Sequence, residues 1–200
     1  MAYSDFTLED IETKFGIENR IEKLFDSPKP VQPSKWLLET LENAKNLPVR
    51  TEKAKSEAIV FPILVELRNL NNKYFTIYSG DNLNADKERG LQGECDFILA
   101  KDVHSFSINY PIIQMVEAKK NDLDLGVPQC AAQLLGAKIF NEKKGVHLEK
   151  IYGCVTTGDE WLFMKLEDLI YVDTRKYYLI ELEELLGAFQ VIIDYYKKTI

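Results

Sequence analysis

Two acids and a lysine, placed at the ends of apolar stretches, are the residues of this chain best suited to chemistry. Glu117 and Lys119 follow a run of β-forming apolar residues that starts at Pro111. Because successive side chains of a strand point to opposite faces, Glu117 and Lys119 project to the same side, with Ala118 between them. Asp96 lies in a second apolar stretch upstream. Two carboxylates beside an ammonium are suited to holding a divalent cation and moving a proton.

Hydrolysis of a phosphodiester is one reaction that would use these residue types. It brings an anionic nucleophile to an anionic phosphorus, so the site must supply positive charge and a deprotonated water, and Mg²⁺ supplies both. Asp96 and Glu117 would each give Mg²⁺ a carboxylate oxygen, and the Ala118 carbonyl would give a third. Lys119 would orient and help to deprotonate the water, or stabilise the charge of the transition state. A dication lowers the pKa of this lysine while carboxylates raise it, and the sequence leaves the balance open.

The order of these residues resembles the PD-(D/E)XK nuclease superfamily, which has the restriction-endonuclease-like fold. Asp96 is on one apolar strand, the Glu117-x-Lys119 triplet ends the next, and a glutamine-bearing helix follows. The likeness covers about residues 51–158 and is greatest to the N-terminal nuclease domain of type I restriction enzyme R subunits. Cys95 stands where the nominal motif has proline. The resemblance implies Mg²⁺-dependent cleavage of DNA, with Mn²⁺ as a substitute metal, with Asp96 and Glu117 as metal ligands and Lys119 as the catalytic lysine.

Two glutamines and one further acid are candidates for support of this site. Gln129 and Gln133 are four residues apart on a predicted helix and therefore share a face. Gln129 is favoured as a catalytic residue because it lies near the helix start, where free backbone N–H groups attract phosphate. Glu94 lies on the same strand face as Asp96 and is an alternative for its role, or an acid that supports it.

Glu57 is expected on the helix that precedes the first core strand. It shares a stripe with Phe61 and Leu64 at spacings of four and seven, so its carboxylate is predicted to face inward. In the superfamily this helix often supplies a glutamate to the metal site, and the resemblance makes Glu57 a candidate metal ligand. The alternative is an ordinary helical acid that pairs with a lysine such as Lys53.

Hydrophobic periodicity and turn residues predict an α/β protein. The expected core is a restriction-endonuclease-like αβββαβ unit, a mixed central sheet flanked by helices, with extra N-terminal helices, a C-terminal β-hairpin and a C-terminal helix. The predicted core elements are a helix over 51–70 that kinks or restarts at Pro62, strands over 73–79, 95–100 and 111–117, a helix over 127–141 and a strand over 151–157. Two short helices are expected within 4–26, short strands at 169–172 and 177–180, and a closing helix at 182–197. The expected division is a helical extension over 1–50 and a nuclease-like domain over 51–200.

Composition limits the partners and the compartment. The 200 residues are 46% hydrophobic and carry a net charge of −7, which counts against a broad phosphate-binding surface. An acid-rich site subtracts from that total, and a bound metal restores positive charge locally. The three cysteines form no C-x-x-C pair and suit reduced core thiols, while His104 and His147 are too few for a histidine-rich metal site. No apolar run reaches ~18 residues, so a cytoplasmic protein without a membrane span is expected.

The sequence therefore predicts a metal-dependent deoxyribonuclease that binds DNA, and a homodimer where two cuts on a duplex are made. The alternative is a catalytically silent nuclease-fold module for binding or assembly in a restriction, defence or mobile-element system. Acidic charge and the absence of a motor or specificity domain in this sequence favour that alternative. A small-molecule enzyme is disfavoured, because the sequence has no glycine-rich phosphate loop and no Ser/His or Cys/His constellation. DNA form, sequence preference and pathway stay open.

Overall fold

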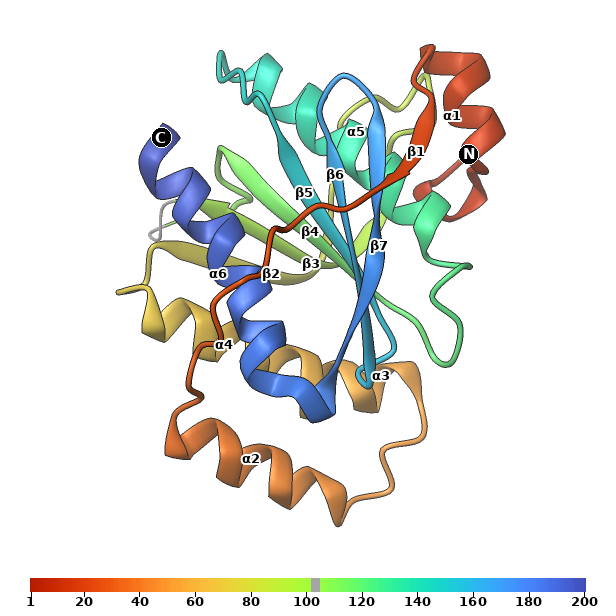
Figure 1. Cartoon of the computed structure of the whole chain (residues 1–200). Helices are drawn as coiled ribbons and strands as arrows, with labels where there is room; N and C mark the ends of the chain where they lie inside the picture. Colours follow the sequence, from red (N-terminus) through yellow and green to blue (C-terminus); the bar gives the residue numbers. More distant parts are fainter. Residues whose placement is uncertain (102–104) are drawn as a thin grey trace.

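A seven-stranded mixed sheet forms the centre of the protein, with strands in the order β1-β7-β6-β5-β4-β3-β2 (Figure 1). The computed structural model describes residues 1–101 and 105–200, so the predicted loop position of His104 lies outside the described residues. The strands are β1 (Asn19–Glu22), β2 (Phe75–Asn82), β3 (Glu94–Lys101), β4 (Ile112–Ala118), β5 (Ile151–Thr156), β6 (Glu160–Leu166) and β7 (Ile170–Tyr178). β4 and β5 are parallel, as are β1 and β7, and the other neighbours are antiparallel. The predicted α/β class is confirmed.

Helices cover both faces of this sheet (Figure 1). They are α1 (Leu8–Phe15), α2 (Lys35–Lys45), α3 (Glu52–Lys55), a π-helical segment (Ser56–Val60), α4 (Phe61–Leu70), α5 (Val127–Lys143) and α6 (Leu182–Thr199), with 3-10 turns at Tyr3–Asp5 and Leu179–Glu181. One core layer lies between the sheet and α5, and the other between the sheet and α4 and α6. Strand alternation divides β3 between them, since Ile98 belongs to the first layer and Phe97 and Leu99 to the second.

Helix α5 starts very close to the sheet. A Cβ atom at Gly126 would lie 2.4 Å from Val155 Cγ1 and 3.0 Å from Lys119 Cγ. Only glycine therefore allows the start of α5 to pack on β5 and on the aliphatic stem of Lys119. Pro128 occupies the first turn of α5, where its missing N–H has no intrahelical role.

The predicted helix over 51–70 is present but contains a π turn. Pro62 has no N–H to donate to the Ala58 carbonyl, and the Phe61 N–H donates to Ser56, five residues earlier. The extra residue in this turn rotates the residues before it relative to those after it. As a result Glu57 is exposed although Leu64 is buried. Phe61, the first residue of α4, is 39% exposed. The predicted inward orientation of Glu57 is therefore wrong.

The N-terminal region contributes a strand as well as helices. α1 ends at Gly16, which adopts a left-handed conformation with φ of 69°. The second short helix predicted within 4–26 is wrong, because Asn19–Glu22 forms β1 and pairs in parallel with β7. That pairing joins segments about 150 residues apart, which local periodicity does not register. The division at residue 50 stays a prediction.

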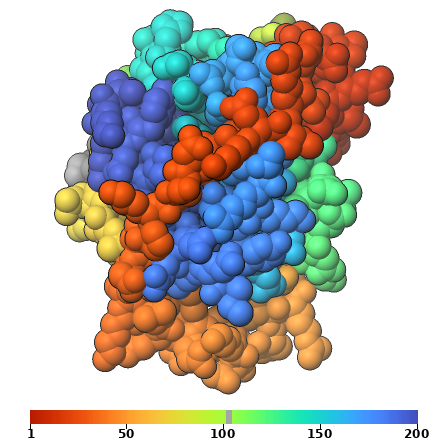
Figure 2. Space-filling view, viewed as in Figure 1, coloured from red at the N-terminus to blue at the C-terminus, as the bar shows by residue number. Residues whose placement is uncertain are grey.

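The C-terminal region follows its predicted order with one change. β5 and β6 form the expected hairpin through Gly158 and Asp159, and α6 closes the chain. The two short strands predicted at 169–172 and 177–180 are one continuous strand, β7, with a register shift against β6. In the space-filling view the orange N-terminal segment crosses the blue surface of this region (Figure 2), and the Val31 N–H donates to the Glu183 carbonyl.

The cysteines and the helices were each the subject of a sequence prediction. The three cysteines are free and buried, as predicted for small core side chains. Within residues 1–101 and 105–200, no helix has the length and apolar character needed to cross a membrane.

Candidate active site

The candidate site is built on two adjacent antiparallel strands, β3 and β4. Phe97 pairs with Val116, so Asp96 and Glu117 lie opposite one another at the next step and on the same face. Asp96 Oδ2 accepts a hydrogen bond of 2.7 Å from the Ala118 backbone N–H. The two acids predicted to converge are therefore neighbours, on the face that α5 covers.

Glu117 is the buried centre of the site, with only 2% of its side chain exposed. Its Oε1 accepts from Lys119 Nζ at 2.6 Å, and its Oε2 accepts from Gln133 Nε2 at 2.6 Å. Lys119 Nζ also donates to Gln129 Oε1 at 3.0 Å. Both candidate glutamines therefore contact the site: Gln129 binds the lysine, and Gln133, which is fully buried, binds the acid.

Burial controls the charges of this cluster. It raises the pKa of Glu117 to about 7, the Asp96 charge adds to the rise, and Lys119 and Gln133 oppose it. Burial also raises the pKa of Asp96, against the opposing Ala118 N–H. Partial burial lowers the pKa of Lys119, but the charge and hydrogen bond of Glu117 outweigh it and the pKa is raised. Ionising both acids is thus costly without further positive charge.

The backbone around Lys119 is fixed by neighbouring elements. The Lys119 N–H donates to the Thr156 carbonyl of β5 at 2.7 Å. The Lys55 ammonium donates to the Lys120 carbonyl at 3.1 Å and pairs with Asp159 at 3.2 Å. Helix α3 and the β5–β6 turn therefore hold the chain segment that follows Glu117, Ala118 and Lys119.

Glu57 does not join this cluster. Its carboxylate is 69% exposed and lies 3.9 Å from Lys53 Nζ, which is the helical ion pair considered as the alternative. Glu52 is the acid of this helix whose charge acts on the site, because it raises the pKa of both Asp96 and Lys119. Sequence reasoning missed Glu52, although Thr51 directly before it is a strong N-cap signal that fixes where the helix starts.

An open cleft of ≈ 560 Å³ lies beside Asp96, between the α3–α4 helical segment and the ends of β2 and β3. Glu94 lines this cleft and is exposed. Of the two acids that the sequence offers for the site, Asp96 accepts a hydrogen bond from the Ala118 N–H, whereas Glu94 lies in the open cleft. The residues that line this cleft beside Asp96 include Glu52, Lys53, Glu57, Phe61, Ser79 and Glu94.

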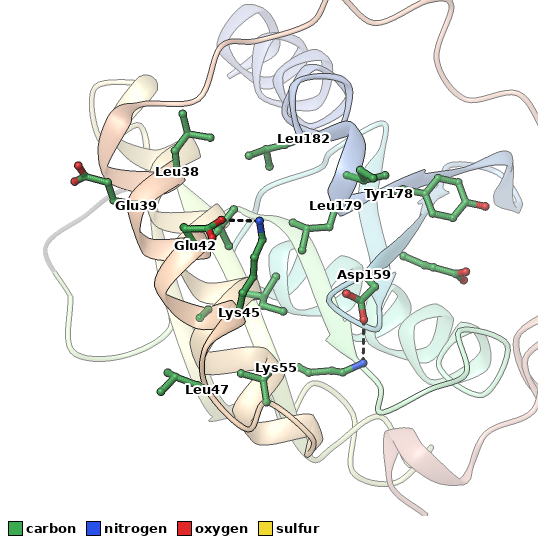
Figure 3. A pocket seen from close by; sticks show the side chains of 16 residues that line it. Leu38, Glu39, Glu42, Lys45, Leu47, Lys55, Asp159, Tyr178, Leu179 and Leu182 are labelled. Atoms are coloured by element: carbon green, nitrogen blue, oxygen red, sulfur yellow. Dashed lines mark hydrogen bonds and ion pairs between the residues drawn. The ribbon is translucent and has the colours of Figure 1, made fainter.

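A larger pocket of ≈ 1120 Å³ lies elsewhere and is mostly apolar (Figure 3). It is bordered by α2, by the α3 segment and by the end of β7, and its rim carries the Glu42–Lys45 and Lys55–Asp159 ion pairs. Neither Asp96 nor Glu117 is among its described lining residues. The larger pocket is therefore not the candidate site. The buried cluster of polar side chains around Glu117 is the candidate, because its pKa values are shifted.

The donor set limits which metal fits. Across the described ranges, no three His, Cys, Asp or Glu side chains are grouped so that they enclose a metal ion. Asp96 and Glu117 offer carboxylate oxygens, the kind of ligand that Mg²⁺ takes together with several waters. Because burial raises the pKa values of both acids, a cation beside them would favour their ionised forms.

Comparison of the chain with protein-family models, curated proteins and solved structures gives no match.

Proposed function

We propose that this protein is a metal-dependent nuclease that hydrolyses DNA phosphodiester bonds with a PD-(D/E)XK-type site. The observation that carries the proposal is the pairing of Asp96 and Glu117 from adjacent strands, with the Lys119 ammonium 2.6 Å from Glu117. Burying two acids beside one lysine costs desolvation free energy. The same groups, two carboxylates and an ammonium, are those that metal-dependent phosphodiester hydrolysis would use.

The order of elements supports a restriction-endonuclease-like core for this proposal. The α3–α4 segment precedes β2, β3 and β4, and α5 then leads to β5, which lies parallel to β4. This is the predicted sequence of helix, three strands, helix and strand. β6, β7, α6 and the N-terminal elements extend that core.

Each polar side chain of the cluster has a role in the proposed reaction. Asp96, Glu117 and the Ala118 carbonyl would hold Mg²⁺, which when bound supplies Lewis acidity and lowers the pKa of a water. Lys119 stabilises the negative charge that develops on the phosphate. Gln129 positions the lysine and Gln133 positions Glu117, through the hydrogen bonds at 3.0 and 2.6 Å.

The proposed setting is the cytoplasm, with DNA as the partner. Three buried free thiols suit a reducing compartment. The net charge of −7 leaves little surface for sequence-independent binding of a duplex, so positive charge at the site must come from Lys119 and the metal. A homodimer is required only where both strands of a duplex are cut.

Loss of the catalytic lysine is the test of this proposal. Plasmid and single-stranded DNA are incubated with wild type, Lys119→Ala and Lys120→Ala, each with Mg²⁺ or Mn²⁺. We expect Lys119→Ala to lower the cleavage rate about 10²- to 10⁴-fold. Lys120→Ala, which removes an exposed neighbouring lysine, should stay near wild type. Equal rates for all three proteins reject the assignment.

A second candidate is a catalytically silent module that keeps the fold for binding or assembly. The observation in its favour is that both Glu117 oxygens are already bound by Lys119 and Gln133. A pKa of about 7 also leaves Glu117 partly protonated in neutral solution without metal. This candidate predicts no carboxylate-dependent uptake of Mn²⁺ and no cleavage, whereas the nuclease requires both.

A further inference from the structure

The cleft beside Asp96 contains an aromatic side chain that the proposed chemistry does not use. Phe61 lines the cleft and is 39% exposed. Its ring lies nearly parallel to that of buried Phe97, with centroids 6.2 Å apart and an angle of 23° between the planes. Phe97 therefore supports Phe61 from beneath, and the exposed part of Phe61 borders the cleft.

Phe61 is the first residue of α4 and lies at the flank of the buried stripe of that helix. Ile63, Leu64 and Leu67 are fully buried, whereas Phe61 is 39% exposed. The Phe61 N–H closes the π turn on the Ser56 carbonyl, so the irregular turn ends at this residue. An exposed aromatic ring next to a candidate active site is a feature that core packing does not require.

The charges of the cleft determine what chemistry can lie against that ring. Among the described residues that line it, Glu52, Glu57, Glu94 and Asp96 contribute carboxylates and Lys53 alone contributes an ammonium. A phosphate would be repelled from such a surface, but a neutral aromatic base would not. Ser79, within β2, is exposed and places a hydroxyl group beside the same space.

The Lys119 ammonium lies at Glu117, the second acid of the pair. Lys119 contacts Glu117 and Gln129, and its stem packs against Gly126 at the start of α5. A nucleotide that spans the pair would thus place its phosphate toward Lys119 and its base toward Phe61. The size of the cleft, ≈ 560 Å³, is in the range of small-ligand sites, so it suits a nucleotide and not a duplex.

We infer that this cleft binds one unpaired base of single-stranded DNA, stacked on Phe61, while the adjoining phosphate lies at Asp96 and Glu117. The inference rests on the proposed nuclease function and names its substrate class. A duplex would have to unpair and unstack a base before it could bind in this way. Single strands meet no such requirement, and aromatic stacking accepts any base.

The test measures binding rather than cleavage. All proteins carry Lys119→Ala so that the strand stays intact, and all assays contain Mg²⁺. The probe is a single strand of about eight nucleotides with a 2-aminopurine at one position, and its duplex is the comparison. Anisotropy gives the affinity, and quenching of 2-aminopurine reports stacking on an aromatic ring.

The comparison of variants at position 61 decides the outcome. We expect Phe61→Ala to bind the single strand about 5- to 100-fold more weakly and to lose the quenching. Phe61→Leu keeps apolar packing on Phe97 and should also lose the quenching, which separates stacking from folding. Tyr178→Ala is the matched control, because Tyr178 is likewise 39% exposed but lines the other pocket. Thermal unfolding of each variant checks that the fold is retained.

Two results overturn the inference: a duplex that binds as tightly as its single strand, or unchanged binding and quenching in Phe61→Ala. These outcomes are distinct from failure of the nuclease proposal. Carboxylate-dependent cleavage with no effect at Phe61 removes only the stacking site. Stacking on Phe61 in a protein that takes up no metal and cuts no DNA removes the nuclease and keeps the single-strand site.

Discussion

Two lysine–glutamate pairs near Asp96, Lys119–Glu117 and Lys53–Glu57, differ in distance and burial. Lys119 Nζ lies 2.6 Å from Glu117 Oε1, with side chains 19% and 2% exposed. Lys53 Nζ lies 3.9 Å from Glu57 Oε1, with side chains 85% and 69% exposed. The residue types are the same, so the difference comes from where the fold places them.

Burial shifts the pKa values of the first pair, Lys119 and Glu117, whereas solvent surrounds the second. Solvent screens the exposed pair, and such pairs contribute about 0–1 kcal/mol to stability. In the buried pair, loss of water raises the pKa of Glu117, and the neighbouring Asp96 raises it further. A cluster whose charges are this strongly coupled responds to a metal, to pH or to a mutation, whereas the helical pair does not.

The largest stability effect is expected for Glu117→Gln in metal-free buffer. Burial raises the pKa of Glu117 from 4.5 to about 7, so between these values the folded protein binds more protons than the unfolded chain. Stability therefore falls as pH rises through that window, and the glutamine variant lacks this loss. Relative to wild type, the variant should gain up to about 3 kcal/mol between pH 4 and pH 8. Urea unfolding with a chelator measures this, and parallel pH profiles would contradict it.

A smaller effect is expected for Lys119→Ala. Removal of the ammonium leaves the Glu117 carboxylate with Gln133 as its hydrogen-bond donor, which should cost about 1–3 kcal/mol at pH 8. At pH 5 Glu117 is protonated and the cost should shrink. Denaturant unfolding at both pH values is compared with Lys120→Ala, which lies next to it and is exposed. A pH-independent loss would show that packing of the lysine stem, not its charge, carries the effect.

The smallest effect is expected for the exposed pair. Lys53→Ala and Glu57→Gln should each change the free energy of unfolding by less than about 0.5 kcal/mol, because both partners are solvated. Thermal unfolding at low and high salt is the measurement. A loss above 1 kcal/mol in either variant would mean that Glu57 is coupled to the site, and the contrast between the two pairs would fail.

Sequence reasoning was correct where the direction of a side chain depends on the regular geometry of its own strand or helix. Strand alternation placed Glu117 and Lys119 on one face, and the apolar strand upstream placed Asp96 beside them. The two glutamines were found by helical spacing, but a shared face does not say which one binds the acid and which the lysine. That assignment depends on how far along α5 the sheet edge lies.

Two expectations failed because the structure there depends on an irregular helical turn and on a long-range strand pairing, not on regular hydrophobic spacing. The π turn before Pro62 moved Glu57 out of the stripe inferred for a regular helix and left Glu52 as the acid that acts on the site. Asn19–Glu22 became a strand because β7 offered a free edge, a partner about 150 residues away. Short exposed segments of this kind carry little hydrophobic signal of their own.

Calorimetric titration with Mn²⁺ tests the central claim most directly, because it examines the Asp96 and Glu117 pair without any DNA. Wild type, Asp96→Asn, Glu117→Gln and Glu57→Gln are compared at pH 8. The account predicts carboxylate-dependent binding in wild type and in Glu57→Gln, and its loss in Asp96→Asn and in Glu117→Gln. Undiminished binding in the Asp96 and Glu117 variants, or no binding in wild type, would contradict it.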